Sequence, residues 1–327
     1  MMSNLSLLAQ APVLNIQLLL DGLFIGAIFV LAAYGLALVW GVMNVKNLAQ
    51  GDFVIMGGYI AYVLSIDLPV WIGIPEGFLW LPISEITFFQ FIKPAIHPIF
   101  GLPVAIVLMF GFGWWIYRVI VSRVVDRDMF TSLLATFGLA IVLQQLLNLL
   151  FGPEVRVAES GFDTRFLFEG LVTVADIKLI SFILTVILAG IVVVFMKYSR
   201  MGQAIRATAQ DRRAARVMGI DTDRVYAFTF ALNAAICGAA GVLISMIWVI
   251  QPYFGLAHSI RAFVIVTAAG LGNLPGVIAA GLGLGATEQF GGFVFGAEYQ
   301  QALVVGMLIL VLVIRQLQQR RHRQAVI

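Results

Sequence analysis

Residues 18–40 read LLLDGLFIGAIFVLAAYGLALVW, and Asp21 is the only charged residue in this run. An α-helix needs about 20 consecutive apolar residues to cross the hydrocarbon core of a bilayer, which is roughly 30 Å thick. The run therefore predicts a transmembrane helix. Six more stretches are long and apolar enough to do the same: 48–66, 99–121, 130–151, 179–197, 226–250 and 300–317.

The composition of the whole chain agrees with these runs. Hydrophobic residues make up 61% of the 327 residues and charged residues 11%, whereas a soluble domain carries roughly 25% charged residues. Lipid must therefore cover much of the outer surface, where only helices or closed barrels satisfy their backbone polar groups. Because the apolar runs have helical length, we predict an all-α, polytopic transmembrane bundle of eight to ten helices, formed by one domain over residues 1–327.

A glycine- and proline-containing break interrupts the apolar stretch 259–290. Residues 270–276 read GLGNLPG, a composition that ends one helix and starts another. We expect a broken helix pair around 259–290, in which two shortened helices meet at 272–276 and the irregular backbone is enclosed by protein or lines a cavity. The segment 69–97 is expected to form an interfacial helix or another short pair.

Three glycine pairs have the four-residue spacing that lets transmembrane helices approach closely. They are Gly22/Gly26, Gly272/Gly276 and Gly281/Gly285. We expect all three pairs to serve helix packing.

Basic residues predict the orientation of the spans. Fourteen of the 20 Lys and Arg residues fall within 118–127, 197–224 and 315–323. Cytoplasmic loops carry an excess of Lys and Arg, so these three groups are expected inside. The segment 152–178 carries five acidic and three basic residues and is expected outside. The N-terminus is then outside, and the basic tail 316–327 is cytoplasmic.

The sequence contains no catalytic or metal-binding motif. His97, His258 and His322 stand far apart, and there is neither an HExxH motif, nor a cysteine pair, nor a Walker A lysine. The glycine-rich run 270–276 opens no βαβ unit, so a dinucleotide site is not expected. We predict no catalytic residue, no metal and no cofactor.

Few ionisable residues lie inside the predicted spans. Asp52 and Glu288 are candidates for a pathway or gating role, because carboxylates within a membrane are costly and usually functional. Helix capping or interhelical hydrogen bonding is the alternative for both. Gln144 and Asn148 share one helix face and are expected to bond between helices rather than to contact a solute. This scarcity of acidic groups disfavours a proton-coupled carrier.

The loop 198–225 is the most informative hydrophilic segment. It is basic, rich in Ala and free of Pro, which predicts a helix over about 203–218 that Gly219 closes as the C′ residue. Its expected apolar stripe comprises Ala204, Ala207, Ala214 and Met218. A helix held between two spans is suited to docking a partner; a solvated charge run that orients the protein is the alternative.

Several motifs, taken together, resemble those of the permeases of branched-chain amino acid ABC importers. They are GQAIRA at 202–207 and AARVMGI at 214–220 in the loop, NLAQGDF at 47–53 with MGGY at 56–59, RAF at 261–263 with GLGNLPG at 270–276, and GATE at 285–288. The resemblance covers about 18–315, and the length suits the shorter, LivH-like subunit.

The resemblance implies an assembly in a bacterial inner membrane. This chain would form the translocation path with a second homologous, LivM-like permease, and two cytoplasmic ATP-binding subunits would drive it. A periplasmic solute-binding protein would deliver the solute, membrane lipid would surround the bundle, and no nucleic acid is implied. The chain itself would hold no ATPase site.

The resemblance also implies roles for particular residues. The cytoplasmic coupling segment would span about 200–221, with ATPase-coupling residues Gly202, Arg206, Asp211, Arg212, Arg213, Ala214, Ala215, Arg216 and Gly219. The candidate pathway and gating residues are Asn47, Gln50, Gly51, Asp52, Gly270, Gly272, Asn273, Gly276 and Glu288. The expected solute is a branched-chain or neutral amino acid; alternatives are a urea or short-amide importer and an ion-coupled carrier acting alone.

Overall fold

We analysed a computed structural model of the chain, which describes residues 7–8, 11–66, 96–167, 172–270 and 272–324. Seven helical segments in this part of the chain are long and apolar enough to cross a membrane. The all-α, polytopic fold class is confirmed. The total of eight to ten helices stays a prediction, because residues 69–95 of the expected outer segment lie outside the described residues.

The seven candidate spans include six of the runs predicted from the sequence. They are α2 (Pro12–Met43), Pro98–Val124, α6 (Met129–Phe151), α7 (Asp176–Tyr198), α10 (Thr222–Ile247), Pro275–Phe295 within α12 (Leu274–Phe295), and Ala297–Leu317 within η6 (Ala297–Tyr299) and α13 (Gln300–Gln324). The span Pro98–Val124 consists of η3 (Pro98–Phe100), α4 (Gly101–Ile116), η4 (Tyr117–Val121) and α5 (Ser122–Val124).

Two central helices organise the bundle. α2 and α10 are buried along most of their length, whereas α7 and α13 are largely exposed. α10 packs against α3 (Gln50–Ser65), α4 and α2, and α2 packs against α12. The sides of the bundle expose apolar side chains such as Val107, Ile191 and Leu312. Such a surface suits lipid rather than water.

Glycines allow the central contacts, as two of the three predicted pairs show. A Cβ on Gly22 would lie 2.6 Å from Cα of Ala286, and one on Gly26 would lie 2.8 Å from the carbonyl oxygen of Gly281. α2 and α12 therefore pack through Gly22/Gly26 and Gly281/Gly285, as predicted. The same prediction for Gly272/Gly276 is wrong, because Gly272 lies in an open turn where an added Cβ would meet nothing within 4 Å.

Two shorter helices, α3 and α11 (Gly255–Ala269), begin inside the bundle. Gln50, at the start of α3, contacts Ala32 near the middle of α2 and Asn233 near the middle of α10. The predicted span 48–66 is therefore a helix of only 16 residues, which is shorter than a bilayer crossing requires. After α2 ends, the chain turns back into the bundle, where Thr136 of α6 bonds the backbone of Lys46 and Leu48.

The predicted broken pair is present as α11 and α12, which are separated by residues 270–273. Two details differ from the prediction. α12 has 22 residues and is therefore not shortened. Asn273 caps its N-terminus, directly before the turn that contains the proline. The backbone at the break is not enclosed either: Gly272 and Asn273 are exposed, and Arg315 donates to the carbonyl of Ala268.

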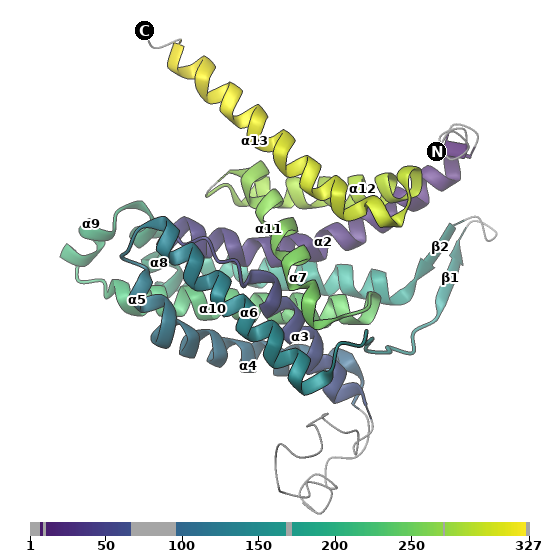
Figure 1. Cartoon of the computed structure of the whole chain (residues 1–327), viewed down its shortest axis with the longest axis horizontal. Helices are drawn as coiled ribbons and strands as arrows, with labels where there is room; N and C mark the ends of the chain where they lie inside the picture. The colour runs from purple at the N-terminus through teal and green to yellow at the C-terminus, as the bar shows by residue number, and fades with distance from the viewer. Residues whose placement is uncertain (1–6, 9–10, 67–95, 168–171, 271, 325–327) are drawn as a thin grey trace, which may run out of the picture.

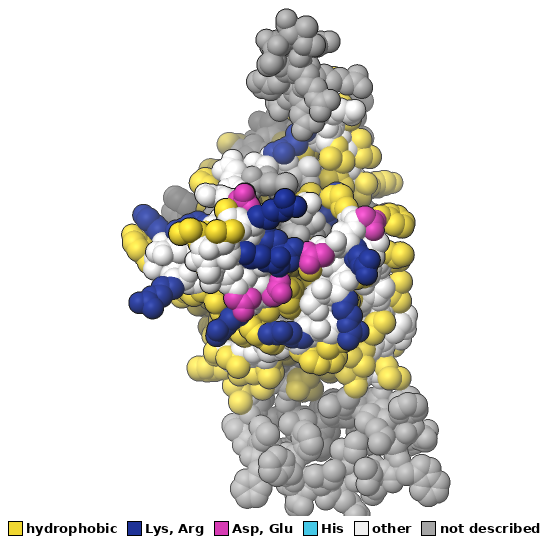
Figure 2. Space-filling model, turned by 90° about the vertical axis from the view of Figure 1, so that its left-hand side faces the viewer, with side chains coloured by type: hydrophobic (Ala, Val, Ile, Leu, Met, Phe, Trp, Pro, Cys, Tyr) yellow, Lys and Arg dark blue, Asp and Glu magenta, His cyan; other side chains and the backbone are white. Residues whose placement is uncertain are grey.

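The two ends of the bundle carry different elements. The axes of most long helices lie roughly along one common line, irrespective of chain direction (Figure 1). α8 (Arg200–Gln210) and α9 (Arg212–Val217) lie at one end of the bundle. At the other end lies a small antiparallel hairpin of β1 (Thr164–Leu167) and β2 (Val172–Ala175). Figure 2 shows Lys and Arg side chains gathered on the end that bears α8 and α9, with apolar side chains around its edge.

Candidate functional site

A cluster of buried polar side chains lies where α3 begins in the middle of the bundle. Gln50 Nε2 lies 2.8 Å from the carbonyl oxygen of Ala32, 2.9 Å from Asn233 Oδ1 and 2.9 Å from Cys237 Sγ. Asn47 Nδ2 donates to Gln50 Oε1 at 3.4 Å. The structure thus brings Asn47 and Gln50 together with partners from α2 and α10 that the sequence analysis did not identify.

Asp52 occupies the first turn of α3, beside the start of α11. Its Oδ1 accepts a hydrogen bond of 3.0 Å from Gln144 of α6, while Oδ2 is buried without a hydrogen-bond partner among the described residues. A Cβ on Gly255 would lie 1.9 Å from Oδ1, so the glycine makes room for the carboxylate. A carboxylate in the first turn is also stabilised by the helix dipole.

Ser259 joins the starts of α3 and α11. Its Oγ accepts from the backbone N–H of Gly51 at 2.8 Å and donates to the carbonyl of Leu48 at 2.8 Å. An added Cβ on Gly51 would lie 1.8 Å from the carbonyl oxygen of Gly255. The two short helices therefore meet backbone to backbone, and Ser259 satisfies the N–H of Gly51 and the carbonyl of Leu48 inside the protein.

Glu288 belongs to a second polar site between α11 and α12. Its Oε1 accepts from Arg261 Nε at 2.9 Å, and the two side chains are 6% and 13% exposed. The guanidinium of Arg261 also lies over the rings of Phe29, at 5.2 Å, and Trp248, at 5.8 Å. Interhelical bonding, one of the two interpretations offered for Asp52 and Glu288, is thus present at both residues. The sequence analysis missed Arg261 as the partner, although an arginine within an apolar run was a visible signal.

The remaining pathway candidates lie elsewhere. Gly270 is next to the side chain of Arg315, and Gly272 and Asn273 are exposed. Asn273 Oδ1 accepts from the N–H of Gly276 at 3.1 Å and caps α12. The structure therefore does not bring these four residues together with the cluster around Gln50.

The predicted coupling segment, about 200–221, consists of two helices, α8 and α9, so the predicted single helix over 203–218 is wrong. Asp211 leaves helical geometry, with φ −153° and ψ 108°, and its Oδ1 accepts from the N–H groups of Arg213 at 2.7 Å and Ala214 at 3.0 Å. An aspartate caps a new helix more favourably than it continues an old one. The break also removes the stripe predicted to run from Ala204 to Met218.

The cap at Asp211 depends on the charge of its carboxylate. Hydrogen bonds from the backbone of Ala214 and of Arg213 lower the pKa of Asp211 below its ordinary value. Because the pKa is lowered in the folded chain, the cap is fully formed above the ordinary pKa and is lost as pH falls through the lowered one. At neutral pH the start of α9 is therefore fully capped.

Glycines hold both ends of the segment in place. Gly219 has φ +84°, its N–H bonds the carbonyl of Arg216, and the N–H of Ile220 bonds that of Ala215, each at 3.0 Å. This is the Schellman arrangement, so the prediction that Gly219 closes the helix is confirmed. A Cβ on Gly202 would lie 2.6 Å from the carbonyl oxygen of Met196, so this glycine allows α8 to pack against the end of α7.

Most of the arginines in the segment bind within the protein. Arg206 donates to the carbonyls of Met196 and Lys197 at the end of α7. Arg212 pairs with Asp126 and Asp223, and Arg216 pairs with Asp223 and donates to Thr222.

Asp126 is the partner that the sequence analysis missed. It follows α5, at the end of the α4–α5 span, and the hydrogen bond from Arg212 lowers the pKa of its carboxyl group. The pair therefore ties α9 to the end of the α4–α5 span. Arg213, in contrast, is exposed.

The tip of α9 exposes two large apolar side chains. Val217 is 87% and Met218 is 80% exposed, whereas Ala215 is buried against the protein. An exposed apolar tip held by ion pairs and a glycine cap is suited to insertion into a partner surface.

Comparison with known proteins agrees with this architecture. A family model described as "Branched-chain amino acid transport system / permease component" matches residues 18–312. The permease protein LivH of the high-affinity branched-chain amino acid transport system of Escherichia coli is 30% identical over 306 residues, which cover 91% of this chain and 93% of LivH. BraD, its counterpart in Pseudomonas aeruginosa, is 29% identical over 92% of this chain and 94% of its own length.

A more distant relative is a probable branched-chain amino acid permease LivH of Methanocaldococcus jannaschii, which is 25% identical over 84% of this chain and 80% of its own length. No solved structure matches the chain. The match of the family model over residues 18–312 and the bundle of apolar spans lead to one conclusion. The chain belongs to the family of permease components of branched-chain amino acid transport systems.

Proposed function

We propose that this chain is a membrane-spanning permease subunit of an ATP-driven importer of branched-chain or neutral amino acids. A second, homologous LivM-like permease would complete the translocation path, two cytoplasmic ATP-binding subunits would drive it, and a periplasmic binding protein would deliver the solute. The observation that carries the ATP-driven part is α9, whose apolar tip stands exposed at the basic end. The chain supplies no ATPase site of its own.

The proposed path uses the polar groups around the start of α3. Asn47, Gln50, Gly51 and Asp52 lie where two short helices begin inside the bundle, a construction that places polar groups at mid-membrane depth. Glu288 lies in the second polar site. We assign Gly270, Gly272, Asn273 and Gly276 to the connection between α11 and α12 rather than to this path.

The proposed coupling route runs from α9 to the spans. An ATP-binding subunit would contact Val217 and Met218 and move α9 when it binds ATP. The ion pair of Arg212 with Asp126 would transmit this movement to the end of the α4–α5 span. Arg206, bonded to the last carbonyls of α7, would transmit it to that helix. Arg213 is exposed and would meet the ATPase surface directly.

The dependence of leucine uptake on ATP or on the proton gradient tests this proposal. In cells that depend on this chain for leucine uptake, depletion of ATP is expected to stop uptake of labelled leucine, while an uncoupler applied with ATP maintained leaves most of it. Cells that lack the chain give the background. Uptake that follows the proton gradient would instead indicate an ion-coupled carrier, and ATP-driven uptake of urea without leucine would indicate a urea or short-amide importer.

Cysteine labelling tests the orientation. In a variant whose buried Cys237 is replaced by alanine, Glu159→Cys should react with a membrane-impermeant maleimide in intact cells. Gln210→Cys should react only after permeabilisation, because α8 belongs to the basic end that we place in the cytoplasm. Both residues are exposed, so access to the reagent alone decides the result. Labelling of both from the same side would contradict the proposed topology.

A further inference from the structure

A groove with apolar walls runs along one side of α13, from its start to near its middle. Its volume is about 370 Å³, and its lining includes Phe295 at the end of α12, Tyr299, and Ala302, Leu303, Gly306 and Leu310 of α13. The positions from Tyr299 to Leu310 recur every three or four residues, so they lie on one face of the helix. An occupant of the groove would therefore lie lengthwise along α13.

The groove is open because α13 leaves the bundle after a tightly packed start. A Cβ on Gly291 would lie 2.3 Å from Cδ1 of Leu303, so the first turns of α13 rest on the end of α12. From there α13 runs at an angle to α2 and away from it (Figure 1). Ala302 and Gly306 are exposed, and a Cβ on Gly306 would meet nothing within 4 Å. These two small residues leave the floor of the groove uncovered.

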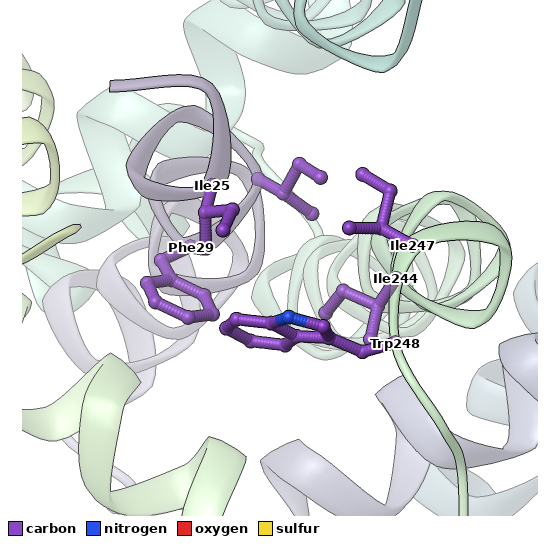
Figure 3. Close-up of a pocket in the computed structure, with 6 residues that line it drawn as sticks. Ile25, Phe29, Ile244, Ile247 and Trp248 are labelled. Atoms are coloured by element: carbon purple, nitrogen blue, oxygen red, sulfur yellow. The ribbon is translucent and has the colours of Figure 1, made fainter. Parts of the chain in front are cut away.

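The contact between α2 and α10 shows what a filled space in this bundle looks like. Ile25 of α2 faces Ile244 and Ile247 of α10, and the rings of Phe29 and Trp248 lie side by side, with centroids 5.6 Å apart (Figure 3). The side chains leave no space there that could hold a water molecule. The groove on α13, in contrast, has room for a ligand.

The dimensions of the groove fit one hydrocarbon chain better than a helix. The rise from Tyr299 to Leu310 is about 16 Å at 1.5 Å per residue, close to half of the hydrocarbon core of roughly 30 Å, which is the thickness of one leaflet. An α-helix about 10 Å across occupies roughly 1,300 Å³ over that length, more than three times the volume of the groove. An unbranched acyl chain can lie along the floor of Ala302 and Gly306.

The mouth of the groove indicates the headgroup of such a lipid. α13 starts at the end of the bundle that bears the β1–β2 hairpin (Figure 1), and Tyr299, with 57% of its surface exposed, suits the interface, where aromatic side chains gather. Glu298 is exposed directly beside it, and residues 262–314 contain no Lys or Arg. A carboxylate at the mouth attracts an ammonium headgroup and repels an anionic one.

We propose that the groove on α13 binds one acyl chain of a phospholipid from the leaflet at the hairpin end, and that this lipid carries an ammonium headgroup, as phosphatidylethanolamine does. The chain lies against the small floor residues and the larger side chains beside them. A lipid on α7, where Ile187 and Val194 project, meets a convex face instead. The lipid in the groove is therefore retained while bulk lipid exchanges. The inference does not rest on the transport function proposed above.

Filling the groove tests the site. Delipidated protein in mild detergent is titrated with dioleoyl phosphatidylethanolamine, and bound lipids are counted by native mass spectrometry. Gly306→Leu and, one turn earlier, Ala302→Leu are each expected to weaken binding of the first lipid about tenfold, the value of roughly two methylene groups that lose their place. Gly190→Leu is the control, because Gly190 is exposed on α7 with nothing within 4 Å of an added Cβ. Wild-type binding by both groove variants would overturn the proposal.

The headgroup is tested by competition between two lipids with the same acyl chains. The wild-type protein is expected to prefer phosphatidylethanolamine over phosphatidylglycerol about fivefold, the upper value of an exposed ion pair. Glu298→Gln should abolish the preference, whereas Glu159→Gln, which changes another exposed carboxylate, should keep it. Equal binding of the two lipids by the wild-type protein would overturn the assignment of an ammonium headgroup.

A protein occupant of the groove would give a different result. If a second permease covers the groove, Gly306→Leu would remove that subunit from the purified assembly, and the amount of retained lipid would be the same in the wild type and the variant. That outcome would also overturn the lipid site. The lipid proposal requires the reverse: the variant keeps its partner subunits and loses the retained lipid.

Discussion

Replacing Gly241 with alanine is expected to prevent α3 and α10 from packing and to leave little folded protein in the membrane. A Cβ on Gly241 would lie 1.8 Å from the carbonyl oxygen of Val54 and 2.8 Å from the backbone nitrogen of Gly58. Both are backbone atoms of α3, so no side chain can rotate away. Overpacking typically costs about 1–3 kcal/mol, and the need to displace a whole helix puts this substitution at or above the upper end of that range.

The measurements are the yield of monodisperse protein in mild detergent and its melting temperature. Gly190→Ala is the matched control, because Gly190 lies in the middle of α7, is exposed, and has nothing within 4 Å of an added Cβ. The control should behave as the wild type does. A Gly241→Ala protein that is equally abundant and equally stable would show that α3 and α10 do not approach one another so closely.

Val217→Asp and Met218→Asp, each alone, are expected to reduce amino-acid uptake to background without unfolding the permease. Both side chains are more than three-quarters exposed, so neither substitution removes a contact within the chain. If α9 docks into an ATP-binding subunit, a carboxylate would enter an apolar contact without a partner. Loss of a central interface residue costs about 2 kcal/mol or more, which is roughly a 30-fold loss of affinity.

Co-purification of the ATP-binding subunits and ATP-driven uptake are the two measurements. Gln203→Asp serves as the control, since Gln203 is exposed in α8 of the same loop and the substitution adds the same charge near a helix N-terminus, where it is tolerated. Uptake and co-purification should persist in the control. Full uptake by both α9 variants would mean that the tip of α9 is not the coupling contact.

Several parts of the candidate site were predictable because their signals are local. Gly219 could be assigned to the end of α9 from its position after the last helical residue, and Asp52 from its being a carboxylate in an apolar run. Asp211 carried a signal that the prediction of one continuous helix underweighted: a short acidic side chain followed by helix-forming residues is typical of an N-cap. Its preference for capping decided the local structure.

Other parts could not be predicted because they depend on distant segments. Arg206 and Arg212 were predicted to be ATPase-coupling residues, but the sequence did not indicate that Arg206 bonds the end of α7 or that Arg212 pairs with Asp126. An arginine can satisfy its donors with any carbonyl or carboxylate within reach, so the residue type alone does not indicate which partner it meets.

The sequence by itself determined six of the seven described segments that are long and apolar enough to cross a membrane, that they are helical, and which family the chain belongs to. It could do so because each span must by itself be long enough and apolar enough to cross the bilayer as a helix, whatever it packs against. Only the tertiary structure decided that α3 and α11 begin in the middle of the bundle, and which polar groups meet there. A buried polar group must find a partner inside the protein, and the partners are remote in sequence: Gln50 meets Asn233, Asp52 meets Gln144, and Arg261 meets Glu288.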